Sequence, residues 1–234
     1  MKKCDIVITV FKQKGADYYR TVESIAKNTR FPYNIITGMG DGSCAENRNI
    51  GLRQVKNDYI AIVDDDVIVT EGWLTQLIET MDKYNADIVF PKILDGTTGN
   101  VLSAEVDFRT FQPWSAIPRY YQQPDAGQAD YIAPALAGGA GFMLIKREVF
   151  DKVGFYDERF KPNQYEDVDY FWRMWLAGFK GVYNGNISLF HLKLGRGAGT
   201  HDGTATRVNW DRLYRKWKDN MEDKSLIYCK GKDE

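Results

Sequence analysis

The chain has 234 residues, of which 44% are hydrophobic and 27% are charged, as in an ordinary globular protein. This composition excludes global disorder and a long coiled coil. The 31 basic and 32 acidic residues give a formal net charge of −1, so no global positive field exists to bind nucleic acid.

The three cysteines, Cys4, Cys44 and Cys229, are odd in number and widely spaced. This pattern predicts neither a disulfide framework nor a metal cluster, and it fits a reducing compartment. The longest weakly apolar stretch, residues 131–145, carries four Gly or Pro residues and is too short for a membrane span. We therefore expect a cytoplasmic protein that at most touches the inner face of a membrane.

The first 91 residues alternate β-branched runs with segments of helical spacing. The expected elements are, in chain order, a strand over 4–11, a helix over 17–28, a strand over 33–37, a helix over 45–55, a strand over 59–63, a helix over 73–84 and a strand over 88–90. Strands that alternate with helices predict βαβ units and a mostly parallel sheet, hence an α/β fold class.

The pattern changes after Pro91, because residues 94–130 are rich in Gly, Pro, Gln and aromatic residues and have no clean period. The elements expected beyond them are a strand within 131–145, a helix over 146–153, a helix over 166–177, strands over 182–183 and 187–190, and a helix over 208–218. We interpret residues 1–234 as a single domain. It comprises a nucleotide-binding half (about 1–91), a half that shapes a second pocket (about 92–191), and a flexible loop with a C-terminal helix (192–234).

Three consecutive carboxylates, Asp64, Asp65 and Asp66, follow directly after the predicted strand over 59–63. Ligands of open α/β sheets bind at the carboxyl ends of strands. The three acids repel one another unless a cation lies on them, and Mg²⁺ and Mn²⁺ prefer carboxylate and diphosphate oxygen. A solvated acidic turn is the alternative, but apolar residues on both sides favour the cation site. The chain has neither a GxGxxG motif after the first strand nor a P-loop.

A second acidic cluster, Glu166, Asp167 and Asp169, begins an otherwise apolar helix. Acidic residues in a first turn stabilise a helix through its dipole. This effect would explain why the residues are acidic, but not why aromatic residues flank them. The aromatic neighbours Tyr165 and Tyr170 would desolvate a carboxylate and raise its pKa, which suits a general base. Elsewhere, His191 ends a predicted strand just before a glycine-rich stretch, where it is either a structural histidine or a metal ligand.

In this order, the motifs resemble the GT-A glycosyltransferases of family 2. The segments that carry the resemblance are Thr9–Phe11, Gly40–Ser43, Glu46–Leu52, Tyr59–Asp66 with Trp73-Leu74, Gly139–Arg147, Val153–Phe160, Tyr165–Asp169 and Gly178-Phe179. They cover roughly residues 4 to 191. Each segment alone is a weak signal, whereas the ordered set is specific.

The resemblance implies a GT-A, Rossmann-like sheet flanked by helices, with an acceptor-binding C-terminal half. It also implies transfer of a hexose or deoxyhexose from a nucleotide-diphosphate sugar to a hydroxyl of a glycan or lipid-linked acceptor, with inversion. Asp167 would be the catalytic base and Glu166 its neighbour near the acceptor. A divalent ion, Mn²⁺ or Mg²⁺, would lie on the diphosphate and neutralise the leaving group.

The family pattern also implies binding roles for individual residues. The donor site would comprise Thr9, Val10, Phe11, Asp41, Arg48, Asp64 and Asp65. The metal would be held by Asp66 and His191, with Asp64 as a further contact. Lys193 and Arg196 lie among glycines and would close over the diphosphate, or else belong to a disordered loop. Gly139 and the aromatic Trp114 are the candidate acceptor contacts.

Two other functions compete with the transferase. A sugar-nucleotidyltransferase would carry a Gly-rich, basic loop after the first strand. Residues 12–15 contain one glycine and two lysines, which is too few for such a loop. A non-catalytic carbohydrate-binding module would need no base, so the presence of Asp66, Asp167 and His191 together argues against such a module. The basic, aromatic helix over 208–218 would rest on a membrane or pack on the domain or on a second subunit, and packing is favoured.

Overall fold

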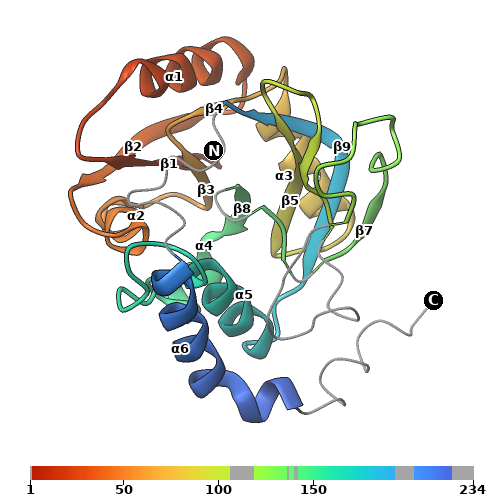
Figure 1. The fold of residues 1–234 in the computed structure, drawn as a ribbon. Helices are drawn as coiled ribbons and strands as arrows, with labels where there is room; N and C mark the ends of the chain where they lie inside the picture. Colours follow the sequence, from red (N-terminus) through yellow and green to blue (C-terminus); the bar gives the residue numbers. More distant parts are fainter. Residues whose placement is uncertain (1, 106–118, 136, 140–141, 193–202, 223–234) are drawn as a thin grey trace.

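The computed structural model describes residues 2–105, 119–135, 137–139, 142–192 and 203–222. Within these ranges the chain forms one nine-stranded sheet of order β2-β1-β3-β8-β5-β9-β4, with β6 added to β5 and β7 added to β9 (Figure 1). The strands are β1 (Cys4–Phe11), β2 (Tyr33–Gly40), β3 (Tyr59–Asp64), β4 (Val67–Ile68), β5 (Ile88–Asp95), β6 (Val101–Ser103), β7 (Ile132–Pro134), β8 (Met143–Lys146) and β9 (Gly181–His191).

Most strands of the central sheet run in one direction. Strand β1 pairs in parallel with both β2 and β3, and β5 pairs in parallel with β9. Strand β8 lies between β3 and β5 and is antiparallel to both, so β3 and β5 share their direction. The expected mostly parallel α/β sheet is therefore confirmed, and it extends through both halves of the chain.

Helices cover both faces of the sheet. They are α1 (Ala16–Asn28), α2 (Cys44–Leu52), α3 (Trp73–Lys83), α4 (Arg147–Val153), α5 (Glu166–Leu176) and α6 (Gly203–Glu222). Side chains of a strand alternate between faces, so Ile6 and Ile8 pack with α1 and α3 while Val7 packs with α2, α4 and α5. A third apolar cluster joins α5 to α6.

Helix α2 is held close to the sheet by its cap and by two glycines. Ser43 is its N-cap, and Ser43 and Glu46 form a reciprocal capping box. A Cβ on Gly38 would come within 2.2 Å of the carbonyl oxygen of Asn47, and one on Gly51 within 2.5 Å of Val7 Cγ1. Only glycine permits this approach, which brings the polar face of α2 to the ends of β1 and β2.

Several predicted boundaries in the second half of the chain were wrong. The two strands expected over 182–183 and 187–190 are one strand, β9, because it pairs with β5 on one side and β7 on the other. The polar residues Asn184 and Asn186, which interrupt the apolar pattern, bond to each other, and Asn184 also bonds to Thr80. The C-terminal helix is longer than the expected 208–218.

Candidate active site

The carboxyl ends of β1, β2 and β3 meet at one edge of the sheet. Thr9 is paired in register with Asp64, and Phe11 with Gly40, immediately before Asp41. The Oγ1 of Thr9 is buried and has no hydrogen-bond partner among the described residues. Phe11 and Asp41 are exposed. This edge therefore exposes an aromatic ring and a carboxylate to a ligand, whereas the unsatisfied hydroxyl of Thr9 is buried.

Val10 contributes differently from its neighbours. Its side chain is fully buried in the apolar core, and its carbonyl oxygen accepts a hydrogen bond from Asn47 Nδ2 at 3.1 Å. Any contact of Val10 with a donor would therefore involve the backbone alone.

The short strand β4 brings the first acidic cluster to His191. Val67 is paired with His191 in an antiparallel ladder, and Leu192 N donates to Asp66 O at 2.8 Å. His191 Nε2 lies 2.9 Å from Asp66 Oδ1, and both side chains are largely buried. Burial lowers the pKa of His191, but the hydrogen bond and charge of Asp66 outweigh burial and leave the pKa raised.

Asp66 and His191 fit part of a divalent metal site. Two N or O ligands that bind one ion at about 2.1 Å in neighbouring positions lie about 3 Å apart, close to the 2.9 Å seen here. Among the described residues, no set of three His, Cys, Asp or Glu side chains converges on one ion. The predicted further contact, Asp64, bonds to Arg48 through Oδ1, and its contact with the ion stays a prediction. A protein site of two ligands suits an ion that takes its remaining ligands from a diphosphate and water.

Arg48 joins the two acidic clusters. Its guanidinium is buried, with Nη1 3.0 Å from Glu166 Oε1 and Nη2 3.3 Å from Asp64 Oδ1. Helix α2 supplies the arginine, strand β3 supplies Asp64, and the first residue of α5 supplies Glu166. The sequence analysis assigned Arg48 to the donor site, and this role stays a prediction. The structure places Arg48 between two carboxylates that are 102 residues apart in the chain.

The two members of the Glu166–Asp167 pair differ in their surroundings. Glu166 is buried and bonded to Arg48, whereas Asp167 is only partly buried. Burial raises the pKa of both carboxyls, and the cation of Arg48 partly offsets the rise. Asp167 is therefore the more accessible acid, with a pKa moved toward the range of a general base.

Burial and the neighbouring acids Asp66 and Asp64 raise the pKa of Asp65 to about 6. This mutual repulsion is the feature that the sequence indicated for three consecutive carboxylates. A bound cation would relieve it, in agreement with a cation-binding role for this turn.

Two stacked tyrosines lie against Arg48, and sequence reasoning connected neither of them with this arginine. Tyr156 and Tyr170 stack with ring centroids 4.2 Å apart, and the Arg48 guanidinium lies 5.3 Å from the Tyr156 ring centroid. Asn49 fixes Tyr156, because its side chain bonds to both the backbone N and O of Tyr156. The sequence feature that could have indicated these contacts is the run of three polar residues, 47–49, in a helix that faces the sheet.

Four further residues were predicted to contact the substrates. Gly139 lies close to the sheet, where a Cβ would come within 2.8 Å of Ile93 Cγ1. Its contact with an acceptor stays a prediction. Trp114, Lys193 and Arg196 lie outside the described residues.

Comparison with known proteins agrees with the α/β fold. The model of the family described as glycosyl transferase family 2 matches residues 41–154. A crystal structure of GalNAc-T7 with UDP, GalNAc and Mn²⁺ superposes on 95% of this chain with a TM-score of 0.66 and 16% sequence identity. The chain therefore has a domain of the GT-A fold that is similar to the family 2 glycosyltransferases. Both acidic clusters belong to this domain, although the Glu166–Asp167 pair and His191 lie beyond the family match.

Curated relatives of the domain are glycosyltransferases by name. Polypeptide N-acetylgalactosaminyltransferase 12 of Mus musculus is 24% identical over 141 residues, which are 56% of this chain and 24% of that protein. Glycosyltransferase GlyG of Streptococcus pneumoniae serotype 4 is 27% identical over 161 residues, 66% of this chain and 50% of that protein. The chain thus matches half or less of the length of each relative. Among the described residues, no helix has the length and apolar character needed to cross a bilayer.

Proposed function

We propose that this GT-A domain transfers a sugar from a uridine-diphosphate sugar to a hydroxyl of a glycan or lipid-linked acceptor, with inversion and with Asp167 as the base. The observation that carries the proposal is the meeting of two acidic clusters at Arg48, beside the Asp66–His191 pair. A donor site with a partial metal site and an accessible carboxylate with a raised pKa are the two components that such a transfer requires.

The acceptor hydroxyl is a poor nucleophile at neutral pH, so it needs a base as it attacks the anomeric carbon. Asp167 takes the proton, because it is partly exposed while its neighbour Glu166 is bonded to Arg48. Arg48 holds Glu166 and Asp64 in fixed orientations, so the position of the base is tied to the donor edge of the sheet. Inversion follows if the hydroxyl attacks from the face opposite the leaving diphosphate.

Asp66 and His191 would hold the divalent ion. When bound, the ion would neutralise the negative charge that develops on the leaving diphosphate. Thr9, Phe11 and Asp41, at the ends of β1 and β2, would bind the base and ribose of the nucleotide. The choice of uridine rests on the structural neighbour, which was solved with UDP, GalNAc and Mn²⁺.

The test combines nucleotide binding with turnover. Calorimetric titrations with UDP, GDP, TDP and CDP are made with and without Mn²⁺, on the wild type and on Asp66→Ala. We expect UDP to bind in a Mn²⁺-dependent manner, and Asp66→Ala to lose that dependence. Absence of binding of all four nucleotides to the folded protein would refute a nucleotide-sugar substrate.

Turnover is measured as UDP release from UDP-GalNAc, UDP-GlcNAc, UDP-galactose and UDP-glucose, with water in place of the unknown acceptor. Asp167→Asn should lower kcat by about 10²- to 10⁴-fold and leave the Kd for UDP unchanged, because a base acts only on the chemical step. NMR of the first-formed free sugar gives its anomeric configuration, and retention would contradict an inverting mechanism. Full activity of Asp167→Asn would refute its role as base.

A further inference from the structure

Helix α6 packs against α5 and against the loop of residues 157–165, which leads into Glu166 (Figure 1). The family match ends at residue 154, so neither this loop nor either helix belongs to the matched region. Leu213 of α6 is fully buried in a cluster with Phe160 and with Val168, Trp172 and Trp175 of α5. The helix is therefore part of the packed domain.

The backbone of the loop is held from two sides. Asn209 of α6 is fully buried, and its Nδ2 donates to the carbonyl oxygens of Lys161 at 3.1 Å and Asn163 at 2.8 Å. The carbonyl of Pro162, between them, accepts from the backbone N of Cys44 at the start of α2 at 3.0 Å. Three consecutive carbonyls are thus fixed alternately by α6 and by the helix that carries Arg48.

The two residues that follow have an unfavourable backbone conformation. Gln164 has a φ of 79° and Tyr165 a φ of 70°, both in the left-handed region that side chains other than glycine disfavour. Such conformations persist only where surrounding contacts impose them, and they cluster at functional sites. Here they come immediately before Glu166 and Asp167, so the contacts of the loop determine where this pair begins.

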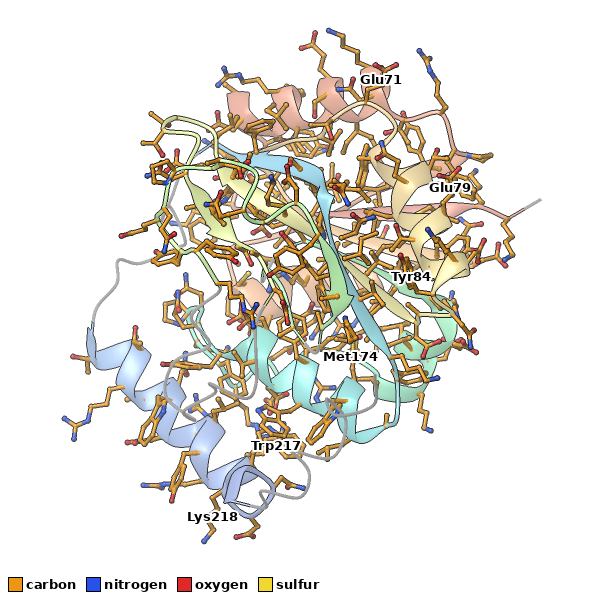
Figure 2. All side chains as sticks on the ribbon, turned by 90° about the vertical axis from the view of Figure 1, so that its right-hand side faces the viewer. Glu71, Glu79, Tyr84, Met174, Trp217 and Lys218 are labelled. Carbon is orange, nitrogen blue, oxygen red and sulfur yellow. The ribbon has the colours of Figure 1, made fainter. Side chains whose placement is uncertain are left out.

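Lys216 connects α6 to both ends of the same segment. Its Nζ lies 3.0 Å from Asp157 Oδ2 and 2.6 Å from Asp169 Oδ1. Asp169 is fully buried in the first turn of α5, two residues after Asp167, and also accepts hydrogen bonds from Trp217 and Arg173. Trp217 faces α5, whereas Lys218 is exposed and points away from α5 (Figure 2).

We propose that α6 is a positioning element for the catalytic base, with Asn209 and Lys216 as its positioning residues. Neither side chain touches the substrate in this proposal. They fix the 161–165 backbone and the first turn of α5, and thereby the place of Asp167 relative to the donor. The proposal rests on the proposed function only in naming Asp167 as the base.

The test compares Asn209→Ala and Lys216→Met with the matched control Lys218→Met, which removes an exposed lysine from the same helix. UDP release from the active UDP-sugar and the Kd for UDP with Mn²⁺ are measured for each. We expect kcat to fall at least about tenfold in the two variants while KM and Kd stay within about twofold, because small displacements of a reacting group slow only the chemical step. Lys216→Arg should recover part of kcat, and Lys218→Met should match the wild type.

Hydrogen exchange of the 161–169 backbone provides a readout that does not depend on activity. Faster exchange of this segment in Asn209→Ala and Lys216→Met, with an unchanged sheet, is expected. Unchanged exchange there would overturn the proposal, as would faster exchange with a normal kcat. If the wild type released no UDP from any donor, the proposed function would fail, while hydrogen exchange would still decide whether α6 holds the segment.

Discussion

The side chain of Arg48 donates through Nη1 to Glu166 Oε1 at 3.0 Å, across 118 residues of sequence. Both side chains are buried, and the same guanidinium reaches Asp64 on the central sheet. One cation therefore ties the strand end that would bind the donor to the helix start that carries the base. The two halves of the domain are joined electrostatically at the point where their substrates would meet.

Breaking this bridge should be costly, because it leaves a buried charge without its partner. Arg48→Met should lower the free energy of unfolding by about 3–5 kcal/mol. In a double-mutant cycle with Glu166→Gln, the double variant should lose less than the sum of the single losses, by about 0.5–3 kcal/mol. Urea unfolding monitored by tryptophan fluorescence measures all four proteins.

The surface pair of Arg53 and Glu158 is the control for this cycle. Its N–O distance of 3.2 Å is similar, but its side chains are 53% and 39% exposed. Its coupling should stay below about 1 kcal/mol, because solvent screens exposed pairs. Equal coupling energies in the two cycles would show that burial does not strengthen the Arg48 bridge.

The pH dependence of turnover should report the raised pKa of Asp167. The base works only when ionised, so kcat/KM for UDP release should fall as the pH drops through the pKa of Asp167, which is raised from that of an ordinary aspartate. The Arg48 cation lowers the pKa of Asp167 and partly offsets burial, so Arg48→Met should move the acidic limb to higher pH.

Arg53→Met is the control, because it removes an exposed arginine just beyond the end of α2. It should leave the acidic limb of the kcat/KM profile at the same pH. The profiles are measured at a temperature at which every variant is folded. An acidic limb at the pH of an ordinary aspartate in the wild type, or a shift to lower pH in Arg48→Met, would contradict the assignment of Asp167 as a base whose pKa is raised.

The close packing of α2 on the sheet should make Gly38 intolerant of a side chain. Gly38→Ala would place Cβ 2.2 Å from the Asn47 carbonyl oxygen, next to Arg48. We expect a loss of about 1–3 kcal/mol in the free energy of unfolding. Gly15→Ala, where a Cβ would have nothing within 4 Å, should change stability by less than about 1 kcal/mol. Thermal unfolding compares the two, and equal stabilities would show that α2 can move away from the sheet without cost.

The sequence by itself determined most elements of the first half and the position of both acidic clusters, although it missed the short strand β4 and ended β5 too early. An apolar run such as residues 59–63 must become a buried strand, so the carboxylates after it surface at the end of β3. The helix start at Glu166 followed in the same way from the periodicity of residues 166–177. Hydrophobic period and residue type are local properties, and no knowledge of distant partners is needed to interpret them.

Only the tertiary structure decided which of these groups meet. His191 lies beside Asp66 because β4 pairs with β9, and Arg48 lies between Asp64 and Glu166 because α2 packs against the sheet beneath α5. Strand β8 lies between β3 and β5, and α6 packs on the loop before Glu166. No local sequence pattern predicts either placement. Pairing between distant segments depends on the total apolar area buried and on the partners available to each charge, which are properties of the whole folded chain.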